Sequence, residues 1–302
     1  MRIVVALGGN ALLMRGEKPD ATVQLHHVEA AARALAPLAA DHELIVCHGN
    51  GPQIGLLALE SEADPSLTRP YPLDTLGAET QGMIGYWLAQ SLRNAGVRKP
   101  ILAVVTQTVV SAEDPAFSAP TKFIGPIYDR AQADKLAHQN GWTIAADGPH
   151  WRRVVPSPEP LRLVEQESIE QLVSSGTIVV CAGGGGAPVV DEGALHGVEA
   201  VVDKDLTSAE LAIAVKADRL LLLTDVPAVM TDFGLPSAEP LHHLDVDEAE
   251  RLTFPAGSMG PKVEACRRFV RATGSTAAIG ALVDAKAILS GAAGTTVLPV
   301  AP

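Results

Sequence analysis

The sequence is poor in cysteine and contains no long apolar run, and each shortage argues against a class of protein. The 302 residues include only three cysteines, Cys47, Cys181 and Cys266, and no two of them form a CxxC pair. Neither a disulfide framework nor a zinc site is therefore indicated. Gly, Pro or charged residues interrupt every apolar stretch well before the roughly 20 residues that a membrane-spanning helix requires.

Positive charge is also in short supply. The formal net charge is −12 and the isoelectric point is about 5.2, which argues against nucleic acid or an anionic membrane as a partner. Strand-like residues begin at Ile3 and glycines follow at once, which is unlike a signal peptide. Hydrophobic residues make up 47% of the chain, enough for a well-buried core. We therefore expect a soluble, cytoplasmic protein.

Several catalytic motifs are missing. The sequence contains no GxxxxGK[ST] and no GxGxxG, so neither a P-loop nor the usual dinucleotide fingerprint is present. HRD and DFG are absent, which excludes the protein-kinase pattern, and neither HExxH nor GxSxG occurs. If this protein binds phosphate, it must do so with a different set of loops.

Apolar runs alternate with segments of helical spacing along most of the chain. Strands are predicted at residues 2–7, 43–47, 101–110, 177–186 (a strand plus a loop), 219–226 and 275–282. Helices are predicted at residues 21–40, 73–94, 167–176, 205–217 and 257–274. Pro37 is expected to kink or end the first helix, and Thr207 with Glu210 has the spacing of a capping box. The alternation indicates an α/β protein with a parallel sheet covered on both faces.

The middle of the chain breaks this alternation. Residues 115–160 contain seven of the 22 prolines and show little periodicity. We interpret residues 111–160, approximately, as a small lid subdomain that protrudes from the sheet. The regular order on either side predicts two lobes, residues 1–165 and 166–302.

Four glycine-rich turns follow predicted strands or precede a helix. They are LGGN (7–10), HGNG (48–51), AGGGG (182–186) and the segment AGSMGPK (256–262). Glycine lets backbone amides approach an anion closely, and the carboxyl ends of parallel strands share one edge of a sheet. Any one of these turns alone is better explained as a tight connection, but four at one edge favour phosphate binding. For His48, beside the second turn, a structural hydrogen bond is favoured over a substrate contact.

Lysine is scarce, and its placement is informative. Three of the eight lysines lie in or beside such loops: Lys122 in PTKFIGP, Lys204 in VDKDL and Lys262 in GSMGPK. A compact ammonium suits the bridging oxygens of a polyphosphate. Lys262 is expected in the first turn of a helix, with Ser258 as its cap. Taken singly, Lys122 is explained as a solvated loop residue and Lys204 as part of a surface ion pair.

Taken in order, these motifs resemble the carbamate kinase family of the amino acid kinase superfamily. The resemblance extends in order from residue 3 to about 297, and it is carried by VALGGNAL, HGNGPQIG, DTLGAETQGMIGYWL, PTKFIGP, WRRVVPSPEP, CAGGGGAPV, GVEAVVDKD and FPAGSMGPK. It implies an open three-layer αβα sandwich with a mainly parallel sheet and a lid, assembled as a homodimer. The implied reaction is reversible phosphoryl transfer, ATP plus carbamate to ADP plus carbamoyl phosphate, with Mg²⁺ entering with the nucleotide and no protein metal ligand assigned.

The resemblance also assigns site residues. The N-terminal lobe would bind the carbamoyl end and the C-terminal lobe the nucleotide. The implied catalytic residues are Lys122, Lys204, Asp205 and Lys262. The residues implied to bind substrate and the phosphoryl group are Gly8, Gly9, Asn10, Gly49, Asn50 and Gly51. The residues implied to bind nucleotide are Gly184, Gly185, Thr224, Asp225, Ser258 and Met259.

One departure from the wider superfamily bears on mechanism. Related kinases carry a lysine just before the first glycine pair, whereas this chain has Ala6 and Leu7 there. We expect Lys122 on the lid to supply the missing charge. Carbamate is itself an oxyanion nucleophile, so no general base is needed. Two alternatives stay open: a kinase of the same fold for another small carboxylate or phosphate, and a non-catalytic nucleotide or metabolite sensor.

Overall fold

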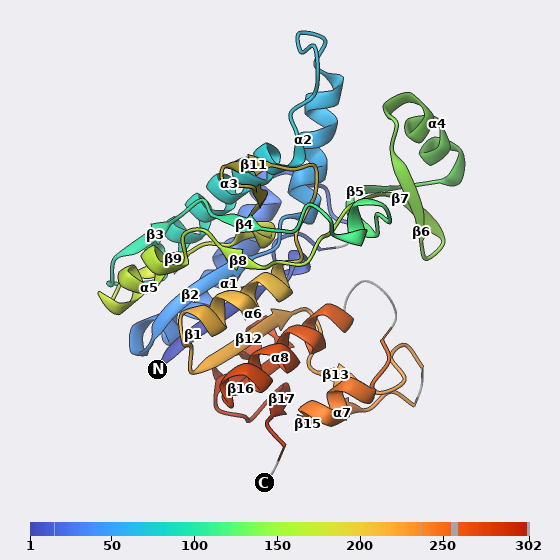
Figure 1. The fold of residues 1–302 in the computed structure, drawn as a ribbon. Coiled ribbons are helices and arrows are strands. Elements are labelled where there is room, and N and C mark those ends of the chain that lie inside the picture. Colours follow the sequence, from blue (N-terminus) through green and yellow to red (C-terminus); the bar gives the residue numbers. More distant parts are fainter. Residues whose placement is uncertain (15, 236, 255–258, 301–302) are drawn as a thin grey trace.

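The computed structural model describes residues 1–14, 16–235, 237–254 and 259–300. Among these residues, eight strands form one central sheet in the order β15-β17-β16-β12-β1-β2-β9-β3 (Figure 1). Neighbouring strands are parallel except for the antiparallel pair β16 and β17. The sheet strands are β1 (Arg2–Leu7), β2 (Glu43–His48), β3 (Ile101–Ala103), β9 (Ile178–Val180), β12 (Arg219–Thr224), β15 (His243–Asp245), β16 (Thr276–Ala281) and β17 (Thr295–Leu298).

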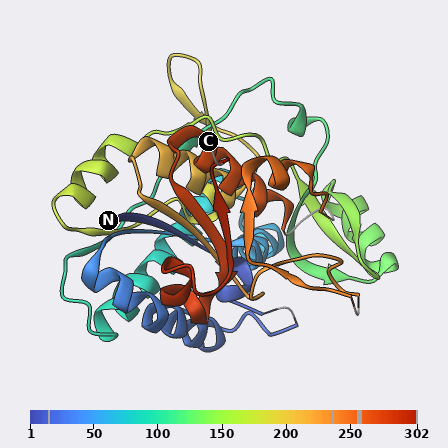
Figure 2. The same cartoon turned by 90° about the horizontal axis from the view of Figure 1, so that it is seen from below.

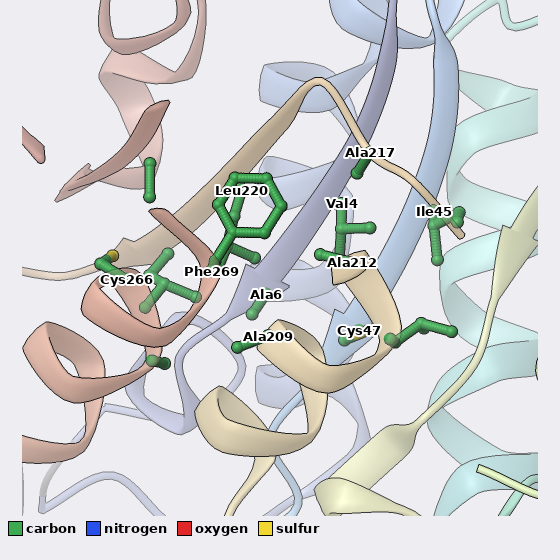
Figure 3. Close-up of a cluster of buried hydrophobic side chains, with 14 of the residues drawn as sticks. Val4, Ala6, Ile45, Cys47, Ala209, Ala212, Ala217, Leu220, Cys266 and Phe269 are labelled. Carbon is green, nitrogen blue, oxygen red and sulfur yellow. The ribbon is translucent and has the colours of Figure 1, made fainter. Parts of the chain in front are cut away.

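Helices cover both faces of this sheet, which confirms the predicted αβα sandwich. Side chains alternate between the faces, so Val4 and Ala6 of β1 lie in one apolar cluster while Ile3, Val5 and Leu7 lie in the other. One face packs against α5 (Gln166–Ser174), α6 (Lys204–Ala214), α7 (Val246–Arg251) and α8 (Gly260–Thr273). The other packs against α1 (Ala21–Asp41), α3 (Leu73–Asn94) and α9 (Ala285–Leu289). Figure 3 shows the first face, where small alanines let α6 lie close to the strands and Phe269 of α8 fills the space beside them.

The segment predicted to form the lid contains a small sheet of its own. A three-stranded antiparallel sheet in the order β5-β7-β6 carries one helix and extends away from the central sheet (Figures 1 and 2). Its elements are β5 (Lys122–Tyr128), α4 (Arg130–Asn140), β6 (Thr143–Asp147) and β7 (His150–Val155). Helix α4 begins with Asp129, whose side chain accepts a hydrogen bond from the Gln132 amide, and ends at Gly141 in the left-handed conformation. These local signals lie within the segment that showed little periodicity.

Smaller elements complete the fold. A second sheet has the order β11-β10-β4-β8, and β13 pairs with β14. The remaining elements are α2 (Gly51–Ala63), β4 (Gln107–Val109), β8 (Arg162–Leu163), β10 (Ala187–Asp191), β11 (Leu195–Gly197), β13 (Val229–Met230), β14 (Pro240–Leu241) and the 3-10 turns η1 (Gly9–Ala11), η2 (Pro115–Phe117), η3 (Gly183–Gly185) and η4 (Leu282–Asp284). Within the described ranges, no helix has both the length and the apolar character needed to cross a membrane.

Two local predictions are wrong, and a third is wrong in one of its two alternatives. Residues 101–110 are not one strand, because the chain leaves the central sheet after β3 and joins the second sheet as β4; buried Thr106 at the change of sheet is held by the side chain of Gln81. Pro37 does not end α1, which continues to Asp41 while its apolar face stays packed, and the kink that was the other expectation for Pro37 stays a prediction. The cap of α6 is Asp203 and not Thr207, because the Asp203 carboxylate accepts hydrogen bonds from the first free amides of that helix.

Candidate functional site

Four adjacent strand ends create the site. The sheet order β12-β1-β2-β9 places Thr224, Leu7, His48 and Val180 side by side at the carboxyl edge. A glycine follows directly after β1 and after β2, and the glycine run of η3 follows β9 after a two-residue connection. Backbone amides and the start of α2 therefore meet at the edge where ligands bind in parallel sheets.

The first two glycine turns are in direct backbone contact. The Gly49 amide donates to the Leu7 carbonyl at 3.0 Å, and the Gly8 amide donates to the Leu223 carbonyl at 2.7 Å. A Cβ added to Gly49 would lie 2.9 Å from both Cα and N of Gly9 and 3.4 Å from Cε of Lys204. Glycine is required at Gly49 because the backbone of the neighbouring turn and the stem of a lysine occupy that space.

The three lysines that the sequence singled out converge on two carboxylates. Nζ of Lys204 lies 2.6 Å from Oδ1 of Asp205, and Nζ of Lys262 lies 3.1 Å from Oδ2 of the same side chain. Nζ of Lys122, from the base of the lid, donates to Oδ2 of Asp203. Residues from β5, α6 and α8 thus form one cluster of alternating charge. The structure brings together the four residues predicted to be catalytic.

The charged side chains of this cluster are mostly buried, so their interactions are only weakly screened by solvent. The side chains of Lys204 and Lys262 are each 11% exposed and that of Asp205 is 5% exposed, whereas Lys122 keeps 34% of its side-chain surface. Burial alone would raise the pKa of Asp205, but the two lysines beside it hold the pKa below its usual value. A doubly bridged carboxylate holds two ammonium groups that would otherwise repel each other.

The two buried lysines respond differently to this environment. Burial lowers the pKa of Lys204, and although Asp205 opposes the change, the nearby charge of Lys262 adds to the lowering. Burial alone would also lower the pKa of Lys262, but Asp205, helped by smaller contributions from two further carboxylates, raises it. Lys262 is therefore the firmly charged member of the pair, and Lys204 is the one that loses its proton more readily.

The alkaline limb of the activity profile tests this difference. Because its pKa is lowered, Lys204 is expected to lose its charge, and kcat to fall, at a pH below the ordinary lysine value of about 10.4. The measurement is kcat against pH for the wild type and for Lys204→Arg, in which the side chain stays charged. The limb is expected to disappear from the residual activity of Lys204→Arg. An identical limb in both proteins would assign it to another group and contradict the prediction.

Asp203 was missed as a site residue by the sequence analysis. Its Oδ1 accepts from the amides of Asp205 and Leu206, while its Oδ2 accepts from Lys122. Burial would raise its pKa, but Lys122 and Lys204 hold the pKa well below the usual range. The sequence signal that could have identified Asp203 is the alternation Asp-Lys-Asp at the start of a helix. That alternation was interpreted only as a surface ion pair of Lys204.

A hydrogen bond to α3 holds the side chain of Asn50 in place. This residue is 4% exposed, its Nδ2 donates to Oγ1 of Thr80 at 2.8 Å, and that hydroxyl donates to the Gly77 carbonyl at 2.7 Å. Gly51 begins α2 directly after it, with open space around the position of a Cβ. Asn10 lies in η1, beside the Gly9 backbone. These residues, predicted to bind substrate or the phosphoryl group, therefore lie in the turns that follow β1 and β2.

The hydrogen bond to Asn50 gives a second prediction. Thr80→Val keeps the shape of the side chain but leaves the buried Asn50 amide without its acceptor, so KM for the small substrate is expected to rise about 5- to 30-fold, from the roughly 1–2 kcal/mol of an unsatisfied group. Initial rates at varied carbamoyl phosphate measure it. Thr276→Val, at the half-buried first residue of β16, is the matched control and is expected to leave KM unchanged. Equal KM values in both variants would contradict the role given to Asn50.

The residues predicted to bind nucleotide are distributed more widely. Thr224 ends β12 beside Gly8, and the exposed Asp225 that follows attracts the charge of Lys262. Met259 caps α8, the helix that carries Lys262. Ser258 lies outside the described residues. The structure places Thr224, Asp225 and Met259 on the C-terminal side of the cluster, and their nucleotide role stays a prediction.

Gly184 lies against Asn50 on the N-terminal side of the cluster, whereas Gly185 lies against the segment that precedes Asp203. A Cβ on Gly184 would lie 2.2 Å from Nδ2 of Asn50, and one on Gly185 would lie 2.5 Å from the Val202 carbonyl oxygen. Both glycines have positive φ and are buried. The loop supports Asn50 and the segment that leads to Asp203, and direct nucleotide contact by these two glycines stays a prediction.

His48 makes the structural hydrogen bond that was favoured for it. Its Nδ1 lies 3.0 Å from the Gly49 carbonyl oxygen, so Nδ1 carries the proton. Burial lowers the pKa of His48 to about 4. The ring is neutral near pH 7 and contributes neither a positive charge nor a general acid to the cluster.

Protein ligands for a resident metal are not gathered at this site. Among the residues that the structure describes, no group of three or more His, Cys, Asp and Glu side chains is placed to hold an ion. Both oxygens of Asp205 are engaged by lysines, and Asp203 receives Lys122. The residues present do not form a cage for Mg²⁺, which prefers several oxygen ligands and retains water.

A sheet edge that gathers glycine amides and buried lysines without a P-loop defines a small-molecule kinase of the αβα type. The profile of the amino acid kinase family matches residues 1–280. The chain is 50% identical to a carbamate kinase of Rhizobium meliloti (strain 1021), covering 98% of this chain and 93% of the relative. It is 48% identical to a carbamate kinase of Escherichia coli (strain K12), covering 98% of both.

Solved structures agree with this assignment. A carbamate kinase from Giardia lamblia bound to citric acid superposes with a TM-score of 0.93 at 36% identity, covering 99% of this chain and 98% of that one. UMP kinase from Bacillus anthracis, at 18% identity and a TM-score of 0.57, shares the fold alone. The chain belongs to the amino acid kinase family, and within that family to the carbamate kinases.

Proposed function

We propose that this protein catalyses reversible phosphoryl transfer between ATP and carbamate, giving ADP and carbamoyl phosphate. The observation that carries the proposal is the convergence of Lys204 and Lys262 on Asp205, beside the glycine turns after β1 and β2. Phosphoryl transfer asks a protein mainly for alignment and charge neutralisation, and this cluster offers both. The similarity to curated carbamate kinases over nearly the whole chain supports the choice of substrate.

In this mechanism the residues have separate tasks. The turn of Gly8 and Gly9 cradles the transferring group, with the Gly9 amide as the donor because the Gly8 amide is bonded to the Leu223 carbonyl, and Gly49 with Asn50 holds the carbamoyl end. Lys204 and Lys262 flank the β- and γ-phosphates, with Asp205 fixing their separation. Lys122 approaches from the lid and supplies the charge that Ala6 and Leu7 lack. Carbamate is already an oxyanion, so no side chain has to remove a proton.

The implied Mg²⁺ is treated as part of the nucleotide substrate. Because the buried carboxylates are engaged by lysines, phosphate oxygens and water supply its ligands in this proposal. The ion neutralises phosphate charge. The chain's own residues bind, align and exclude water.

We also propose a cytoplasmic homodimer that runs toward ATP synthesis in catabolism, with carbamoyl phosphate supplied by the breakdown of arginine or of purines or allantoin. Three free, buried thiols suit a reducing compartment. Tyr86 of α3 and Leu102 of β3 are 58% and 46% exposed on packed elements at the sheet edge, which supports a second copy binding there.

The test is a coupled assay for ATP formed from ADP and carbamoyl phosphate, with and without Mg²⁺. The proposal expects Mg²⁺-dependent ATP formation by the purified protein. Acetyl phosphate in place of carbamoyl phosphate tests a kinase for another small carboxylate. ADP binding by calorimetry with no turnover in either direction would favour a non-catalytic sensor and contradict the proposal.

A further inference from the structure

The base of the lid rests on α2 through a contact between two backbones. A Cβ added to Gly55 of α2 would lie 2.0 Å from Cα and 2.2 Å from N of Gly125 in β5. Gly125 itself has φ +71°, and its carbonyl accepts a hydrogen bond from Arg152 at 2.8 Å. The neighbouring register between β5 and β7 is irregular from Ile124 to Tyr128. The lid strand is bent at the residue that touches the helix.

An apolar cluster surrounds this contact and joins five segments: α2, α3, β5, β7 and the chain before α6. We call the cluster, together with the two glycines, the lid seat. Its members are Ile54, Gly55, Ala58, Leu73, Leu76, Ile124, Gly125, Val155 and Val201. The Val201 amide also donates to the Pro156 carbonyl at 3.0 Å, just after the lid's last strand. The lid base is thereby tied both to α2 and to the segment that leads to Asp203.

Lys122 lies on the same strand, three residues before Gly125. Its ammonium has to cross from the lid to Asp203 at the start of α6. A shift of β5 away from α2 moves the Lys122 backbone with it. Because Gly55 and Gly125 have no side chains, β5 can lie directly on α2. The distance between β5 and α2 therefore determines where the Lys122 ammonium lies.

We propose that Gly55 is a positioning residue for phosphoryl transfer, acting through Lys122 by letting the lid strand lie directly on α2. This inference rests on the proposed function for its kinetic readout. A methyl group at Gly55 needs about 3.5 Å to the Gly125 backbone, so the lid must move by about 1.5 Å. Misplacing a catalytic group by about 1 Å can lower a rate about 100-fold.

The kinetic test compares Gly55→Ala with Gly82→Ala. Gly82 lies in α3, is exposed, and has open space around its Cβ position, so its replacement controls for alanine in a helix. We expect kcat of Gly55→Ala to fall at least about 10-fold with KM for ADP within about twofold of wild type, and Gly82→Ala to match wild type. Equal activity in the two variants would overturn the proposal.

A double-mutant cycle separates positioning from general damage. If Gly55 acts through Lys122, then adding Gly55→Ala to Lys122→Ala lowers kcat by less than about twofold more. Losses that multiply in the double variant would overturn the proposal. Ile124→Val shortens one side chain of the lid seat and is measured in the same cycle in case Gly55→Ala does not fold. Its smaller loss is expected to vanish in Lys122→Ala, and a loss that persists there would count equally against the idea.

Amide hydrogen exchange tests the support of β5 by the lid seat without a measurement of catalytic activity. Amides of residues 122–128 are expected to exchange at least about fivefold faster in Gly55→Ala than in Gly82→Ala, since the strand loses its support. Unchanged exchange would overturn the proposal. If the wild type forms no ATP from carbamoyl phosphate, the proposed function fails, and the exchange result still decides the lid seat.

Discussion

Replacing Lys122 with alanine is expected to lower kcat for ATP formation about 10²- to 10³-fold, the usual effect of losing one charged group aimed at the transition state. KM for ADP is expected to stay within about twofold, because Lys122 contacts Asp203 from the lid while Lys262, on α8, lies on the predicted nucleotide side. Steady-state rates with varied ADP and saturating carbamoyl phosphate measure both constants.

Lys135→Ala is the matched control for this experiment. Lys135 lies in α4 of the same lid, but it is exposed and outside the cluster. Its replacement is expected to leave kcat unchanged and so separates the position of the charge from the net charge of the lid. A wild-type rate in Lys122→Ala would remove the lid from the mechanism.

Replacing Asp205 with asparagine is expected to have the second large effect. The change leaves Lys204 and Lys262 facing each other without the carboxylate that bridges them at 2.6 and 3.1 Å. Breaking a buried ion pair on one side costs about 3–5 kcal/mol, so the free energy of unfolding should fall by about that amount. We expect kcat to fall at least about 100-fold as the lysines separate or lose a proton.

The pH profile of Asp205→Asn shows whether kcat falls because a lysine loses its proton or because the lysines separate. Asp205 raises the pKa of Lys204 against burial, so its neutralisation should lower that pKa further and move the alkaline limb toward neutral pH. Denaturant unfolding and kcat against pH are the measurements. Asp20→Asn is the control, since Asp20 caps α1 without a side-chain hydrogen bond. An unshifted limb together with wild-type stability would contradict the bridging role.

The sequence predicted well where a side-chain pattern determines the structure. The range of α3 was predicted at Leu73–Asn94, and β1 was predicted at Arg2–Leu7, because their apolar spacing is regular. The three lysines were selected by their position next to glycine turns. Their convergence depends on strand order, since β5, α6 and α8 are far apart in the chain.

The missed features depend on contacts between distant segments. Helix α2 opens with Gly51 and Pro52 directly after a glycine turn, and these residues hid a helix that packs against the lid. The run at residues 101–110 looked like one strand, because the bonds between Thr106 and Gln81 that hold the change of sheet are invisible in a local pattern. Asp203 looked like the partner of Lys204 in a surface ion pair. Its hydrogen-bond donor Lys122 lies 81 residues away in the chain, so a local pattern does not reveal it.

The most direct measurement is a crystal structure with ADP, Mg²⁺ and aluminium fluoride as a mimic of the phosphoryl group in transit. We expect fluoroaluminate between Lys204 and Lys262, with fluorines within about 3.2 Å of both Nζ atoms and of the Gly9 amide. Fluoroaluminate bound beside the nucleotide but more than about 6 Å from either lysine would contradict the claim that this cluster holds the transferring group.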